Sequence, residues 1–137
     1  NLIIKRHPDI AENDFSPEFY SQFSDIEIFK NGDLPDLLVN SEFVISLGIS
    51  SGILEAQILQ KPVISINAEY DIFGSTNYIP NSCTHIQIEE FDKLFSKIVA
   101  DSSSSNDLIQ KGTNSLNNNI SNIGNSSHVL FDCLIEL

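Results

Sequence analysis

The sequence has few cysteines and few basic residues, and both shortages exclude whole classes of protein. Only two of its 137 residues are cysteines, Cys83 and Cys133, and they form no CxxC motif. A disulfide-stapled fold or a cysteine-based zinc site is therefore not expected. Seven Lys and Arg residues stand against 19 Asp and Glu, so the formal net charge is −12. This charge argues against nucleic acid or an anionic membrane surface as a general partner.

Long apolar runs and several functional motifs are also missing. No stretch approaches the roughly 18–20 apolar residues of a membrane-spanning helix. No signal-peptide pattern opens the chain, because the basic pair Lys5-Arg6 follows the first apolar run instead of preceding it. There is no GxGxxG, no HxxxH and no lysine after the glycine–serine turn at 48–52. These absences remove ATPase and simple dehydrogenase interpretations, and we expect no metal ion.

What is present is an alternation of apolar strands and helices. The strand candidates are 2–4, 26–29, 43–47, 63–66 and 84–88, and the helix candidates are 17–23, 33–40, 53–60 and 89–100. Near-continuous apolar strands separated by helices are typical of a parallel sheet that is covered on both faces. The sequence therefore predicts an α/β fold with a Rossmann-like parallel sheet and helices on both faces.

The composition divides the chain into three parts. Residues 1–100 carry the strand–helix pattern, and 101–125 are rich in Ser and Asn, which predicts either a mobile segment or a solvated helix. Residues 126–137 are predicted to form a helix that packs back on the domain. Because Asn1 is followed at once by an apolar run, we expect this chain to be a piece of a longer protein.

A candidate anion site lies at the end of the third predicted strand, where the sequence reads Gly48-Ile49-Ser50-Ser51-Gly52-Ile53-Leu54-Glu55-Ala56. Ser50 or Ser51 is a natural N-cap. The amides of the first helical turn, the helix dipole and two hydroxyls suit a phosphate or diphosphate. Gly48 and Gly52 would allow close backbone approach, and Glu55 could accept hydrogen bonds from a ribose diol. An ordinary capped helix, with Glu55 completing a capping box or favouring the helix dipole, explains the spacing equally well.

The only cluster of positive charge, Lys5-Arg6-His7-Pro8, follows the first predicted strand. Beside an anion site it would offset the repulsion that a charge of −12 imposes on a phosphorylated ligand. His7 could donate a hydrogen bond to a phosphate or carry a proton. Ligands of parallel sheets sit outside the carboxyl ends of the strands, so we expect this basic tip and the turn at Gly48 to face one crevice. A solvated strand end is the competing interpretation.

These segments together resemble a known family. Ile3-Ile4-Lys5-Arg6-His7-Pro8, then Ser50-Ser51-Gly52-Ile53-Leu54-Glu55-Ala56 and Lys61-Pro62-Val63-Ile64, are similar to the C-terminal domain of GT-B-fold glycosyltransferases. The likeness is to surface-polysaccharide enzymes: sialyl- and Kdo-transferase-like proteins, CDP-glycerol glycerophosphotransferases and the related UDP-N-acetylglucosamine 2-epimerases. It covers residues 1–67. It departs at Gln60, where many relatives carry Gly.

The resemblance implies the Rossmann-like half that binds the nucleotide of an activated sugar, with its first strand lying before Asn1. His7 would be the catalytic residue, in contact with the nucleotide or its phosphate, and Lys5 and Arg6 would add positive charge. The phosphate would be held at the helix start and the ribose by Glu55. The residues implied to hold the phosphate are Gly48, Ser50, Ser51 and Gly52.

The leading expectation is the nucleotide-sugar-binding C-terminal part of a glycosyltransferase that acts in surface polysaccharide synthesis. The donor would be a CMP-, CDP- or UDP-linked sugar, and the partner would be an N-terminal domain of the same protein, without which no turnover is expected. A UDP-GlcNAc 2-epimerase-like enzyme and a non-catalytic α/β module for protein contacts are the alternatives. The expected location is the cytoplasm, with a peripheral position at the inner face of the membrane left open for the full-length protein. The oligomeric state is open.

Overall fold

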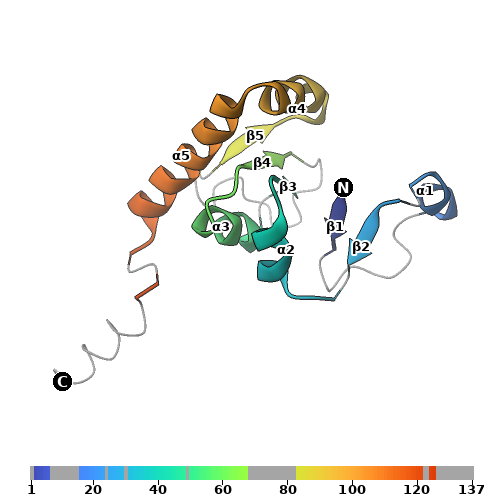
Figure 1. Cartoon of the computed structure of the whole chain (residues 1–137), viewed down its shortest axis with the longest axis horizontal. Helices are drawn as coiled ribbons and strands as arrows, with labels where there is room; N and C mark the ends of the chain where they lie inside the picture. Colours follow the sequence, from blue (N-terminus) through green and yellow to red (C-terminus); the bar gives the residue numbers. More distant parts are fainter. Residues whose placement is uncertain are drawn as a thin grey trace. The chain divides into compact units, whose positions relative to one another are not determined.

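The computed structural model describes residues 2–6, 16–23, 25–29, 31–48, 50–67, 83–121 and 124–125. It divides into two units, Asn1–Leu37 and Leu38–Leu137, each of which is described by itself (Figure 1). The predicted residues His7 and Pro8, the connection 68–82 and the C-terminal helix 126–137 lie outside the described residues. The described part of the chain contains no helix that is both long enough and apolar enough to span a bilayer.

The first unit contains two parallel strands and a short helix. β1 (Ile3–Lys5) pairs with β2 (Glu27–Phe29), and the amide of Arg6 extends the pairing by donating to the Phe29 carbonyl at 2.8 Å. α1 (Pro17–Gln22) begins after Ser16, whose hydroxyl accepts from the Phe19 amide at 3.2 Å. Ser16 therefore caps this helix, and proline occupies its first position, where it is well tolerated.

The second unit is built on three parallel strands. β3 (Val44–Leu47), β4 (Val63–Ile66) and β5 (Thr84–Ile86) pair in the order β3-β4-β5. All four residues of the central strand β4 are buried, which explains its near-continuous apolar sequence. β3 is less enclosed, with Leu47 75% exposed. The α/β class and the parallel pairing predicted from the sequence are thus observed.

Helices α2 (Leu34–Asn40), α3 (Ser51–Ile58), α4 (Phe91–Ala100) and α5 (Ser102–Asn119) complete the described structure, with a 3₁₀ turn, η1 (Ile88–Glu90), before α4. The core of the second unit contains Ile64, Ile66 and Ile86. Side chains from the start of β3, from α4 and from α5 pack against it: Phe43, Phe91, Leu94 and Leu108. The helix predicted over 89–100 thus directs Phe91 and Leu94 into this core.

The Ser/Asn-rich stretch is a single helix over Ser102–Asn119. Asp101 caps it, since its Oδ1 accepts from the Ser103 amide at 2.9 Å. α5 packs against α3, α4 and β4 (Figure 1). Of the two states predicted for this stretch, the helix is the one that the structure contains.

Candidate functional site

The turn after β3 is held by one glycine and two serine hydroxyls. Gly48 has φ +73°, in the left-handed region that favours glycine. Its amide donates to the Ile66 carbonyl at 2.8 Å. Its carbonyl accepts from the hydroxyls of Ser46 and of the fully buried Ser65, both at 2.9 Å. These bonds anchor the turn to both β3 and β4 at the carboxyl ends of the strands.

The first turn of α3 lacks the side-chain cap that usually covers the amides at the start of a helix. Ser50 occupies the N-cap position in an extended conformation, but its hydroxyl makes no capping bond. That hydroxyl lies 3.3 Å from the Ser46 hydroxyl instead. The Ile53 amide is satisfied by the Ser50 carbonyl at 3.1 Å. Across the part of the chain that the structure describes, no side chain caps the amides of Ser51 and Gly52, which therefore remain available to an acceptor.

Glu55 lies one turn further along α3 and is half-buried. Because the helix begins at Ser51, the third helical position is Ile53, and Glu55 cannot complete a capping box with Ser50. The capping box predicted as one explanation of Glu55 is therefore wrong. A carboxylate one turn from a helix start can still accept hydrogen bonds from a bound hydroxyl.

The described part of the basic tip belongs to the first unit. Lys5 is half-buried, and its Nζ donates to the Arg6 carbonyl at 2.9 Å, while Arg6 is only 8% exposed. His7, the predicted catalytic residue, lies outside the described residues. The convergence of this tip with the Gly48 turn stays a prediction.

A second polar cluster lies at the start of β5. Cys83 is buried, and its Sγ lies 3.8 Å from Nε2 of His85. Lys111 reaches across from α5 and donates to the Thr84 hydroxyl at 3.5 Å. His85 is an exposed residue, but the partial burial of its imidazole lowers the pKa below its ordinary value of 6.5, and the charge of Lys111 lowers this pKa further. Nowhere among the described residues do three His, Cys, Asp or Glu side chains gather as a metal site would require.

The lowered pKa of His85 predicts that acid destabilises the fold. The folded state disfavours the protonated imidazole, so stability present above pH 6.5 is lost as the pH falls through the depressed folded-state pKa. We expect the urea midpoint of the native chain to drop more between pH 7.5 and pH 5.5 than that of His85→Gln. Lys111→Gln should reduce the drop only partly, because burial is the larger cause. An identical drop in native chain and His85→Gln would contradict this assignment.

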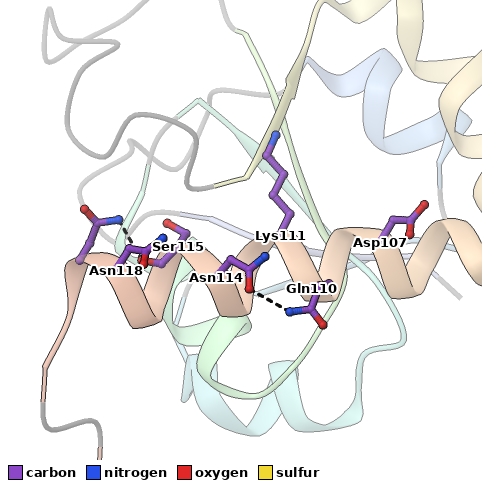
Figure 2. Close-up of a pocket in the computed structure, with 7 residues that line it drawn as sticks. Asp107, Gln110, Lys111, Asn114, Ser115 and Asn118 are labelled. Atoms are coloured by element: carbon purple, nitrogen blue, oxygen red, sulfur yellow. Dashed lines mark hydrogen bonds between the residues drawn. The ribbon is translucent and has the colours of Figure 1, made fainter.

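Sequence reasoning did not find an open surface pocket that lies along α5. Its volume is about 530 Å³, and the described side chains that line it all belong to that helix, between Asp107 and Asn119 (Figure 2). The Asn-rich composition is the signal in the sequence that coincides with it. No known protein family, curated protein or solved structure matches this chain, so its function has to be argued from these geometries.

Proposed function

We propose that the second unit binds the phosphate group of a nucleotide sugar at the start of α3, as the donor-binding half of a glycosyltransferase with a Rossmann-like fold. The observation that carries this proposal is the open first turn of α3, where the cap serine is bonded to Ser46 and leaves the amides of Ser51 and Gly52 uncapped. A phosphate oxygen supplies the acceptor that such amides lack.

The distribution of acidic residues supports the same assignment. The chain carries a charge of −12, and the other described α-helices each have a carboxylate at the start. These carboxylates are Glu18 in α1, Asp36 in α2, Asp92 in α4 and the cap Asp101 of α5. The first turn of α3 has none. Where no carboxylate of the chain lies near a helix start, the positive end of the helix dipole can instead stabilise a bound anion.

The position of the Gly48 turn in the sheet also favours ligand binding. The Gly48 turn follows β3 at the carboxyl end of a parallel sheet, which is where ligands of open α/β sheets bind. In the proposed mechanism the amides and the Ser51 hydroxyl stabilise the negative charge that develops on the leaving nucleotide as the glycosidic bond breaks. Glu55 accepts hydrogen bonds from the ribose.

The test is a titration of ¹⁵N-labelled chain with CMP, CDP and UDP, followed by amide shifts. We expect shifts centred on Ser51 and Gly52, and affinity at least about tenfold lower in Ser51→Ala, because one hydrogen bond to a charged group is lost. Ser102→Ala is the matched control: it removes the same hydroxyl from the first position of α5, where Asp101 already caps the amides. Its affinity should be unchanged.

Three results would overturn the proposal. They are the absence of shifts with every nucleotide, shifts that avoid the start of α3, and equal losses in Ser51→Ala and Ser102→Ala. A further variant, His7→Ala, tests the basic tip separately. We expect it to weaken binding, and unchanged affinity would remove His7 from the site while leaving the α3 start in place.

A further inference from the structure

The serine hydroxyls near the carboxyl ends of β3 and β4 form a hydrogen-bonded chain with a fixed direction. Ser46 and Ser65 are partners in the β3–β4 register, so their side chains lie on the same face of the sheet. Both hydroxyls donate to the Gly48 carbonyl at 2.9 Å. A hydroxyl has a single proton, and that of Ser46 is used on Gly48. Ser50 is therefore the donor across the 3.3 Å between its hydroxyl oxygen and that of Ser46.

This direction decides what the Ser50 hydroxyl can do. An N-cap serine usually accepts from the amide of the second or third helical residue, and these residues are Gly52 and Ile53 in α3. The Ile53 amide already bonds to the Ser50 carbonyl at 3.1 Å, so Gly52 carries the amide that the hydroxyl could cover. Ser50 has the extended backbone of a cap residue, with φ −146° and ψ 159°, but makes no such bond. The bond to Ser46 thus holds the side chain of Ser50 away from its capping position.

The Gly48 turn has other supports that do not depend on Ser46. The hydroxyl of Ser65, which is 0% exposed, donates to the same carbonyl. The Gly48 amide donates to the Ile66 carbonyl at 2.8 Å. Loss of the Ser46 hydroxyl therefore leaves the turn anchored to β4. Its main consequence falls on Ser50, whose hydroxyl loses its acceptor and becomes free to rotate onto the helix start.

We propose that Ser46 is a positioning residue, which keeps the first turn of α3 uncapped by accepting the hydrogen bond of Ser50. A Gly52 amide that is covered by Ser50 cannot donate to a phosphate, so capping competes with ligand binding. A ligand that needs the uncapped state loses affinity in proportion to the population of that state. The effect on a ligand rests on the nucleotide binding proposed above, whereas the position of Ser50 can be tested in the free protein.

The test compares Ser46→Val with Ser46→Thr. Valine and threonine have nearly the same shape and both suit a strand, but only threonine keeps a hydroxyl. In the 137-residue chain without ligand, we expect hydrogen exchange of the Gly52 amide to be about fivefold slower in Ser46→Val than in Ser46→Thr, because a serine cap contributes about that factor. In titrations with CDP and UDP, the affinity of Ser46→Val should be lower by the same factor.

Ser50→Ala, added to Ser46→Val, separates capping from other damage to the turn. Alanine cannot cap, so Gly52 exchange and nucleotide affinity should both return toward those of Ser46→Thr. Equal exchange in Ser46→Val and Ser46→Thr would overturn the role of Ser46, and so would a loss of affinity that Ser50→Ala does not relieve. If exchange slows in Ser46→Val while no nucleotide binds the native chain, the role of Ser46 is supported and the proposed function fails.

Discussion

Replacement of Ile64 by alanine is expected to lower the free energy of unfolding by about 2–5 kcal/mol. Ile64 is completely buried in the central strand β4, where it packs with Ile66 and Ile86. Alanine leaves a cavity that this closely packed core cannot fill without moving its neighbours. Domains of this size unfold at a cost of about 5–15 kcal/mol, so the loss would be a large fraction of the total. Urea denaturation followed by circular dichroism measures it.

Ile45 supplies the matched control. It lies opposite Ile64 in the β3–β4 register and has the same side chain, but it is 36% exposed. Ile45→Ala should cost about 1 kcal/mol or less, because less apolar surface returns to water. Equal losses in the two variants would contradict the central position of β4 in this sheet.

The strands were predictable because a buried strand has a recognisable apolar sequence. β4 is enclosed on all sides, and a strand in that position reads as a short continuous apolar run. The one polar residue in the run, Ser65, is tolerated because its hydroxyl donates to the Gly48 carbonyl. The helix start at Ser51 was predictable for a similar reason, since small polar residues follow a strand and precede good helix formers.

The details of the candidate site were not predictable, because they depend on contacts between distant residues. The sequence predicts that a serine at the N-cap covers the helix amides, yet the Ser50 hydroxyl lies beside Ser46. This arrangement becomes visible only after β3 and the turn have positions in space. Likewise, the burial of Arg6 cannot be inferred from a basic triplet that looks solvated.

The packing of α5 could not be predicted from the sequence for a different reason. Its buried positions include Ser104, Gly112 and Ser115, with Leu116 as the one large apolar residue among them. A search for hydrophobic periodicity does not count serine or glycine as packing residues. Small residues nevertheless allow two helices to approach closely, and α5 uses them where it meets α3. The contact that results can be tested directly.

Gly112→Ala is expected to destabilise the protein although alanine is the better helix former. A Cβ at this position would lie 2.9 Å from Cγ of Gln57 and 3.3 Å from its Cδ. Gln57 is only 4% exposed, so its side chain has little room to move away. Overpacking of this kind costs about 1–3 kcal/mol, against a gain of about 1 kcal/mol in helix propensity. We expect a net loss of about 1 kcal/mol, measured by urea denaturation.

The Gln57→Ala background separates the clash from every other effect of the substitution. With the long side chain removed, the three nearest atoms to the new methyl group are gone, and Gly112→Ala should then stabilise the protein through helix propensity. The double-mutant cycle would show a favourable coupling of about 1–3 kcal/mol between the two changes. Additive effects would instead mean that α3 and α5 are not in contact at these residues. They would contradict the packing of α5 against α3 that the structure contains.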